Sequence, residues 1–270
     1  MIIGFIGAGN MARSLVGGLI SQGIVPSDIL MSDLHPETLE KLHQELGIRT
    51  TQNNHEVAAQ ATTIILAVKP QVMKSVIESI REPLQQHRPL IISIAAGTPC
   101  ANLMQWLDAP IPLIRCMPNT PALVQTAASA LYATPHTKTE HKLTAEQILQ
   151  SVGLAVWVEN EEQLDAVTAL SGSGPAYFFY LMEAMIQAGL TMGLSETLSC
   201  QLTLQTALGA AKMAQQSALD PAKLRAQVTS PGGTTAAAIQ HFEQMNLGQH
   251  ITDALQAAHI RAQELAQDVQ

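Results

Sequence analysis

The residues best suited to chemistry lie late in the chain, where two adjacent glycines stand among hydroxyl side chains. Residues 228–236 read Val-Thr-Ser-Pro-Gly-Gly-Thr-Thr-Ala, and a helical pattern follows at once. Glycine has no Cβ, so a backbone built from it can approach a bound molecule closely. The unpaired N–H groups of a helix N-terminus attract a carboxylate. The stretch therefore predicts a site for a substrate carboxylate, with an ordinary capped helix start as the alternative. Its candidate residues are Ser230, Gly232, Gly233, Thr234 and Thr235.

A second glycine-rich helix start lies at the other end of the chain. Residues 7–12 read Gly-Ala-Gly-Asn-Met-Ala, after an apolar run at 2–6 and before a helical pattern. In this GxGxxA arrangement Gly7 permits a tight turn, Gly9 lets the backbone approach a pyrophosphate, and Ala12 allows close helix packing. A strand, a turn and a helix in this order favour dinucleotide binding over a purely structural turn.

An acidic residue follows the second expected strand, residues 29–32. Asp33 lies near the position at which such folds place a carboxylate beside the adenosine ribose. A carboxylate accepts a hydrogen bond from a 2′-hydroxyl and repels a 2′-phosphate, so Asp33 by itself favours NADH. A solvated turn carboxylate is an equally good interpretation.

The elements that must position these residues alternate between strands and helices. Further strands are expected over 62–68, 90–96, 111–115, 127–133 and 154–158, which predicts an α/β fold with a parallel, Rossmann-type doubly wound sheet. Ligands bind at the carboxyl ends of such strands. Two segments with small residues lie there and leave room for a nicotinamide: Ala67-Val68-Lys69-Pro70 and Ala95-Ala96-Gly97. The later turn at 117–121 could carry Asn119 or Thr120 to the site, or form a rigid corner.

The character of the chain changes after a polar stretch at 159–163. We expect a dinucleotide-binding domain over 1–160 and an all-helical domain over 164–270, with no strand in the latter. A helix that begins near Ser173 and runs to Gly189 is apolar nearly all round. Such a helix should be buried on every side, which predicts packing against another subunit.

Composition narrows the class of protein. The 270 residues carry a net charge of −8 and no basic cluster, which argues against nucleic acid or anionic membranes as partners. No apolar run is long enough to span a bilayer, and no signal peptide is evident. Three separated cysteines fit a reducing, cytoplasmic compartment. The nine histidines lack metal-ligand spacing, so no metal site is expected.

Together, these stretches resemble the pyrroline-5-carboxylate reductase family over almost the whole chain. The matching motifs are Gly4-Phe-Ile-Gly-Ala-Gly-Asn-Met11, Ala67-Val-Lys-Pro70, Arg115-Cys-Met-Pro-Asn-Thr-Pro121, Asp165-Ala-Val-Thr-Ala-Leu-Ser-Gly-Ser-Gly-Pro-Ala-Tyr177 and Ser230-Pro-Gly-Gly-Thr-Thr235. The resemblance implies hydride transfer from NAD(P)H to 1-pyrroline-5-carboxylate, which gives L-proline in the last step of proline biosynthesis. It also implies dimers formed by the C-terminal helices, often assembled into decamers.

The resemblance also assigns roles to residues. It implies that the loop of Ser230, Gly233 and Thr234 holds the substrate carboxylate, that the Thr235 hydroxyl meets the ring nitrogen, and that Glu161 lies near the substrate. On the cofactor side it points to the turn with Gly7, Ala8, Gly9, Asn10 and Met11, to Asn54, and to the segments 67–70 and 95–97. NADPH is the family's usual cofactor.

One departure and two alternatives remain open. NADPH-using relatives often have Ser or Asn followed by Ser or Arg after the second strand, whereas this chain has Ser32-Asp33-Leu34, which makes NADH a competitor. A 3-hydroxyacid dehydrogenase of the same plan would need a catalytic lysine, and the C-terminal lysines, Lys212 and Lys223, lack a suitable motif. A non-catalytic NAD(P) sensor would have less reason to keep the double-glycine stretch intact.

Overall fold

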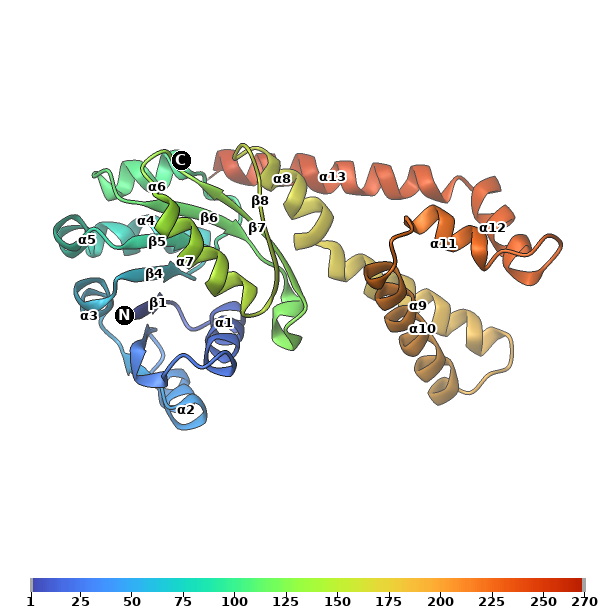
Figure 1. Cartoon of the computed structure of the whole chain (residues 1–270), viewed down its shortest axis with the longest axis horizontal. Helices are drawn as coiled ribbons and strands as arrows, with labels where there is room; N and C mark the ends of the chain where they lie inside the picture. The colour runs from blue at the N-terminus through green and yellow to red at the C-terminus, as the bar shows by residue number, and fades with distance from the viewer. Residues whose placement is uncertain (1, 269–270) are drawn as a thin grey trace. The chain divides into compact units, whose positions relative to one another are not determined.

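The computed structural model describes residues 2–268 and divides them into two compact units (Figure 1). The first unit runs from the N-terminal strand to Ser173 and takes up the chain again from Ala258. The second unit is Gly174–Ala257. The sequence-based boundary at 160–164 precedes the structural one, because the short helix after residue 162 packs on the sheet of the first unit.

The first unit is built on an eight-stranded sheet of order β3-β2-β1-β4-β5-β6-β7-β8. Neighbouring strands are parallel except for β6 and β7, which are antiparallel. The predicted doubly wound sheet is confirmed, with this one reversal near its edge. The strands are Ile3–Ile6 (β1), Ile29–Ser32 (β2), Arg49–Thr51 (β3), Thr63–Leu66 (β4), Leu90–Ser93 (β5), Leu113–Met117 (β6), Ala127–Ala133 (β7) and Gly153–Trp157 (β8).

The central strands are buried on both faces because helices cover each side. Every residue of β1, β2, β4 and β5 is buried, and the apolar side chains separate into two clusters, one on each face of the sheet. The covering helices are Asn10–Ser21 (α1), Pro36–Leu46 (α2), Asn54–Gln60 (α3), Pro70–Ser79 (α4), Arg81–His87 (α5), Cys100–Leu107 (α6), Thr139–Gln150 (α7) and Gln163–Val167 (α8). Shorter helical turns occupy Pro26–Asp28, Thr120–Val124 and, as a π-helix, Thr168–Gly172.

Strand β3 was not expected from the sequence. It is three residues long, reads Arg-Thr-Thr, and is only partly buried at the edge of the sheet. Strand predictions depend on apolar runs or alternation, and this segment has neither. It forms because β2 offers an open parallel edge, with Met31 opposite Thr50.

Beyond β8 the regular elements of the described chain are all helical, as predicted. The last helix begins in the second unit and ends in the first. The helices are Gly174–Thr191 (α9), Glu196–Gln216 (α10), Pro221–Gln227 (α11), Thr234–Gln244 (α12) and Leu247–Asp268 (α13).

Helix α9 is apolar but poorly covered by its own chain. Phe178 and Phe179 are each 64% exposed and Tyr180 is 74% exposed, while only Gly174 and Gly189 are buried. The single chain therefore does not bury this helix, and the burial expected of it would have to come from another subunit, as the sequence predicts. An apolar face of this extent on a helical unit is typical of a surface that another protein chain covers.

Candidate cofactor and substrate sites

The glycine turn after β1 has the form that a bound pyrophosphate requires. Gly7 has φ +100, and a Cβ there would lie 2.7 Å from the carbonyl oxygen of Ala67, so only glycine fits. A Cβ on Gly9, by contrast, would meet no atom within 4 Å. Gly9 is the N-cap of α1, which has no side-chain cap and no acidic residue in its first turn. The N-terminus of α1 therefore presents free amides and partial positive charge in an open space, which fits a phosphate.

Asp33 lies directly beside this turn. Its Oδ2 accepts a hydrogen bond from the Ala8 N–H at 2.9 Å, and its Oδ1 accepts one from the His35 N–H at 3.0 Å. Asn54, at the start of α3, lies near the same end of β2, where its Oδ1 accepts from the Ser32 hydroxyl at 2.7 Å. These residues thus gather beside the amide edge of the turn, where the ribose next to a bound pyrophosphate would lie.

The other predicted cofactor segments meet the turn at the same edge of the sheet. Ile6, Leu66 and Ser93 stand at equivalent positions in β1, β4 and β5. The residues after them, including Ala67–Pro70 and Ala95–Gly97, therefore leave the sheet side by side. Lys69 is the N-cap of α4 and Pro70 occupies its first turn. The structure brings together all the predicted cofactor residues of the first unit.

In the turn at 117–121, Asn119 belongs to a rigid corner, whereas the Thr120 side chain beside it is exposed. The Asn119 side chain is buried and fully engaged with backbone groups. Its Nδ2 donates to the Ser171 carbonyl at 3.0 Å, and its Oδ1 accepts from the Ala128 N–H at 2.9 Å. Asn119 therefore fixes the point at which the chain reverses from β6 into the antiparallel β7.

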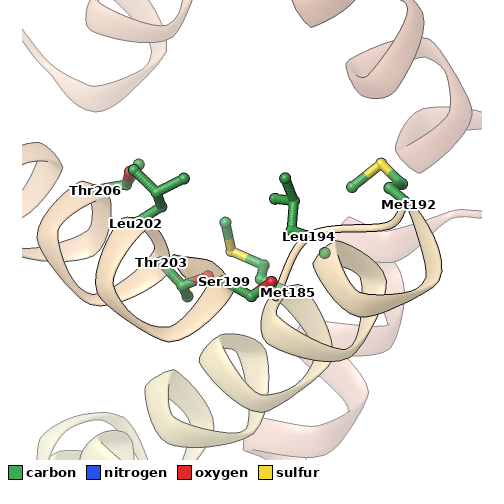
Figure 2. A pocket seen from close by; sticks show the side chains of 8 residues that line it. Met185, Met192, Leu194, Ser199, Leu202, Thr203 and Thr206 are labelled. Carbon is green, nitrogen blue, oxygen red and sulfur yellow. The ribbon is translucent and has the colours of Figure 1, made fainter. Parts of the chain in front are cut away.

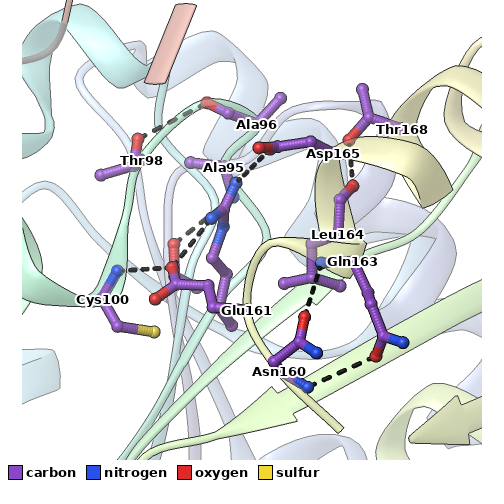
Figure 3. A network of polar contacts seen from close by, with 12 residues as sticks. Ala95, Ala96, Thr98, Cys100, Asn160, Glu161, Gln163, Leu164, Asp165 and Thr168 are labelled. Atoms are coloured by element: carbon purple, nitrogen blue, oxygen red, sulfur yellow. Dashed lines mark hydrogen bonds and ion pairs between the residues drawn. The ribbon is translucent and has the colours of Figure 1, made fainter. Parts of the chain in front are cut away.

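Glu161 belongs to a polar network beneath the loop that follows β5 (Figure 3). Its Oε1 accepts from the Cys100 N–H at 2.7 Å and from Arg115 Nη1 at 2.8 Å. Asp165 Oδ1 lies 3.8 Å from Arg115 Nη2. Burial raises the pKa of Asp165, and the Arg115 guanidinium opposes that rise. Sequence reasoning selected Glu161 alone, although Arg115 and Asp165 both open motifs of the family resemblance.

Both cysteines of the first unit, Cys100 and Cys116, are free and buried. Burial raises the pKa of the Cys100 thiol, and the nearby Glu161 carboxylate raises it further. Burial alone raises the pKa of Cys116. A nucleophilic cysteine needs a stabilised thiolate, so neither thiol is suited to covalent chemistry.

The double-glycine stretch forms the start of α12 in the second unit. Gly233 is the N-cap, the helix has no side-chain cap, and its first turn contains no acidic residue. Gly232 has φ +71 and a Cβ there would meet nothing within 4 Å. The Gly233 N–H donates to the Ser230 carbonyl at 3.0 Å and closes the turn. Within the described residues, the hydroxyls of Ser230, Thr234 and Thr235 have no hydrogen-bond partner, so they are available to a ligand.

A pocket in the second unit lies apart from these residues, between α9 and α10 (Figure 2). Methionine and leucine side chains form its wall together with three hydroxyls, and the Ser199 oxygen is buried without a partner in the described structure. None of the predicted site residues contributes to it. The lining residues are Met185, Gly189, Met192, Leu194, Ser199, Leu202, Thr203 and Thr206.

None of the helices in the described part of the chain is both long and apolar enough to cross a membrane. Residues 2–268 also contain no group of three or more His, Cys, Asp or Glu side chains arranged to hold a metal ion.

Comparisons with known proteins agree with both halves of this description. Residues 2–97 match the family model for NADP oxidoreductase, coenzyme F420-dependent, and residues 161–265 match that for pyrroline-5-carboxylate reductase dimerisation. The chain is 50% identical to a pyrroline-5-carboxylate reductase of Pseudomonas aeruginosa, over 99% of this chain and 97% of the relative. It is 40% identical to the Haemophilus influenzae enzyme of the same name, over 98% and 97%.

Solved structures show the same relationship. A pyrroline-5-carboxylate reductase from Coxiella burnetii superposes with a TM-score of 0.94 and 42% identity, covering 98% of each chain. One from Plasmodium falciparum, solved with NADP bound, superposes with a TM-score of 0.87 and 27% identity, again over 98% of each chain.

The sheet, its glycine turn and these matches define a nicotinamide-dependent oxidoreductase. More narrowly, the chain belongs to the pyrroline-5-carboxylate reductase family. Its helical part, which includes α9, matches the dimerisation region of that family.

Proposed function

We propose that this protein reduces 1-pyrroline-5-carboxylate to L-proline with NAD(P)H, in the last step of proline biosynthesis. The observation that carries the proposal is the uncapped, acid-free start of α12 within a chain that matches the family from end to end. Family membership also weighs against a hydroxyacid dehydrogenase, and the intact double-glycine loop weighs against a sensor that has lost its substrate site.

The start of α12 supplies two fixed points for a small cyclic imino acid. The free amides near Gly232 and Gly233, with the hydroxyls of Ser230 and Thr234, bind the carboxylate. The Thr235 hydroxyl accepts a hydrogen bond from the ring N–H of the protonated imine. Anchored at both ends, the ring presents its imine carbon in one orientation, and orientation alone is a large part of catalysis in a two-reactant step.

The chemistry needs no strong acid from the protein. Protonation of the ring nitrogen makes the C=N carbon electrophilic, and the bound reduced nicotinamide supplies the hydride. The electron pair of the C=N π bond then returns to the nitrogen, which becomes the secondary amine of proline. A site built from amides and hydroxyls is therefore sufficient, which explains why no histidine or cysteine is required.

On the cofactor side we propose NADPH first and NADH as a competitor. The relative from Plasmodium falciparum was solved with NADP bound, and residues 2–97 match an NADP oxidoreductase model. Asp33 points the other way, because its carboxylate lies against the Ala8 amide and would repel a 2′-phosphate placed beside the turn. His35, whose backbone N–H binds the same carboxylate, is the residue that we propose to offset that repulsion.

We further propose that the protein is cytoplasmic, that it forms a dimer through its C-terminal helices, and that such dimers assemble into a decamer. Matching of residues 161–265 to a dimerisation model and the exposure of Phe178, Phe179 and Tyr180 support the dimer. The free state of Cys100, Cys116 and Cys200 is compatible with a reducing compartment.

The direct experiment is a spectrophotometric assay of NADPH and NADH oxidation with 1-pyrroline-5-carboxylate, with L-proline identified as the product. We expect turnover with at least one cofactor and inhibition by proline. Binding of the dinucleotide without turnover of this imine would contradict the proposal and favour the sensor.

A further inference from the structure

Arg115 and Glu161 form a buried ion pair beside the loop between β5 and α6, residues 94–99. At the start of the loop, Ser93 lies opposite Arg115 in the parallel pairing of β5 with β6. At its end, the N–H of Cys100 donates to Glu161 Oε1 at 2.7 Å. The same oxygen accepts from Arg115 Nη1 at 2.8 Å (Figure 3). One guanidinium–carboxylate pair thereby links β6, the strand beside β5, to the helix that follows the loop.

Burial makes this link strong. The side chains of Arg115 and Glu161 are only 6% and 20% exposed. A buried guanidinium needs an anion as a partner, and charge-assisted hydrogen bonds are shorter and stronger than neutral ones. Asp165 adds a second carboxylate to the same guanidinium at 3.8 Å, but it has no hydrogen bond to the loop. Within the network, Glu161 is thus the carboxylate that reaches the backbone of Cys100.

The path between the two ends is also constrained. Gly97 has φ +65, and a Cβ there would lie 3.2 Å from the Cβ of Leu265 in α13. Thr98 is fully buried and Ala95 nearly so. These contacts restrict the path of the loop, so its height above the sheet edge depends on where its two ends are held.

We propose that Glu161 and Arg115 are positioning residues, which hold loop 94–99 where the nicotinamide ring rests, and that Glu161 acts through the Cys100 amide and not on the substrate. The proposal rests on the proposed function only in assigning this loop to the nicotinamide half of the cofactor. Hydride transfer requires reacting atoms about 3–3.5 Å apart, and an error of about 1 Å can cost about 100-fold in rate. A fixed loop therefore matters to the reaction without touching the imine.

The test compares three substitutions of one residue. Glu161→Ala removes both hydrogen bonds, Glu161→Asp keeps the charge but is one methylene too short to reach both donors, and Glu161→Gln keeps the length and an acceptor oxygen. The first readout is the fluorescence of NADPH titrated into the protein without substrate. We expect Ala and Asp to weaken NADPH binding about tenfold and to shift the emission of the bound nicotinamide, and Gln to restore both.

The kinetic readout separates positioning from substrate contact. We expect Glu161→Ala to lower kcat while the KM for 1-pyrroline-5-carboxylate stays close to the wild-type value. Asp165→Asn is the matched control, because it removes a carboxylate from the same guanidinium without altering the loop. Its NADPH binding and emission should stay near those of the wild type.

The opposite pattern would overturn the proposal. Unchanged NADPH binding and emission, with a raised KM for the imine, would place Glu161 on the substrate. If Glu161→Ala does not fold, the Glu161→Asp and Glu161→Gln variants provide the test. The proposed role is contradicted if the Asp variant binds NADPH as tightly as the Gln variant, or more tightly. NADPH binding is measured without the imine, so a wild-type protein that binds NADPH but does not reduce the imine refutes the proposed function alone.

Discussion

Two glycine-rich helix starts, one at α1 and one at α12, share a chemical design but differ in what holds them. Both lack a side-chain cap and an acidic residue in the first turn. The turn before α1 is enclosed, since Gly7 packs on the Ala67 backbone and the Ala8 N–H is bound by Asp33. The turn before α12 is open, and the Gly233 N–H donates to the Ser230 carbonyl within the turn itself.

The difference teaches that the two sites obtain their rigidity from different sources. The cofactor turn is shaped by strands that are distant in sequence, so it is preorganised within its own unit. The α12 loop is shaped by local backbone geometry, and its hydroxyls have no hydrogen-bond partner among the described residues. Ligand affinity at the first site should therefore depend on packing, and at the second on individual hydrogen bonds.

The largest expected effect breaks the enclosed turn. Gly7→Ala places a Cβ 2.7 Å from the Ala67 oxygen at φ +100, so the turn must distort. We expect the free energy of unfolding to fall by about 2–5 kcal/mol, from backbone strain and overpacking together, and NADPH affinity to collapse. Gly9→Ala is the control, because its Cβ meets no protein atom. It should keep the melting temperature and weaken NADPH binding only. Thermal unfolding and NADPH titration check both variants, and a Gly7→Ala protein with wild-type stability would contradict the enclosure.

The second-largest effect is expected from removing one hydroxyl group, that of Thr235, from the open loop at the start of α12. Thr235→Ala should lower kcat/KM for 1-pyrroline-5-carboxylate by about 10–100-fold, the worth of one oriented hydrogen bond to a charged group. Stability and NADPH binding should not change, because this hydroxyl has no partner among the described residues. Thr235→Ser should recover most of the rate. An unchanged rate in the alanine variant would remove Thr235 from the reaction.

A smaller expected effect tests whether the charge of Asp33, at the enclosed turn, influences the choice between NADPH and NADH. Asp33→Ser should raise the ratio of kcat/KM for NADPH to that for NADH by about five- to tenfold, because one negative charge near the 2′-phosphate is removed. Asp33→Asn serves as the matched variant, since it loses the charge but keeps an oxygen for the Ala8 N–H. Equal shifts in the two variants would attribute selectivity to charge, while a shift in Ser alone would attribute it to the geometry of the turn. A ratio unmoved in both would exclude Asp33 from cofactor choice.

The smallest expected effect concerns how the stability of the folded protein at Asp165, beside Arg115, depends on pH. Burial raises the pKa of Asp165 in the folded protein, so the folded state holds this proton more tightly than the unfolded chain. The resulting stabilisation is complete below the ordinary aspartate pKa of about 3.9 and is lost as pH rises through the raised value. Asp165→Asn should therefore gain stability relative to the wild type as pH rises across that window. Denaturant unfolding at several pH values measures the difference, and a trend of opposite sign would show that pairing with Arg115 outweighs burial.

Much of the fold could be predicted because its signals are local. The apolar runs of β1, β2, β4 and β5 and the glycine turn at Gly7 are visible in short windows of sequence. Strand β3 was missed because its three polar residues pair only where β2 leaves an edge open. The all-round apolar pattern of α9 predicted that another subunit covers it, but periodicity does not show which surface of that subunit provides the cover.

The candidate site divides in the same way. Residues that follow strand ends, such as Ala67 and Ala95, were found because parallel topology places strand ends together. The link between Arg115 and Glu161 joins residues 46 apart in the sequence and has no local signature. Only tertiary structure shows that Glu161 is already occupied by the Cys100 amide and the guanidinium.

Helix α13 has a consequence for how this protein can be divided. The chain leaves the first unit after Ser173 and re-enters it at Ala258, where Leu265 comes to lie against Gly97. A fragment ending at Ser173 would thus leave a bare patch beside loop 94–99. Chimaeras of related proteins are constrained in the same way. The C-terminal part of α13 and the sheet should come from the same parent, because otherwise the contact between α13 and loop 94–99 joins side chains from two different proteins.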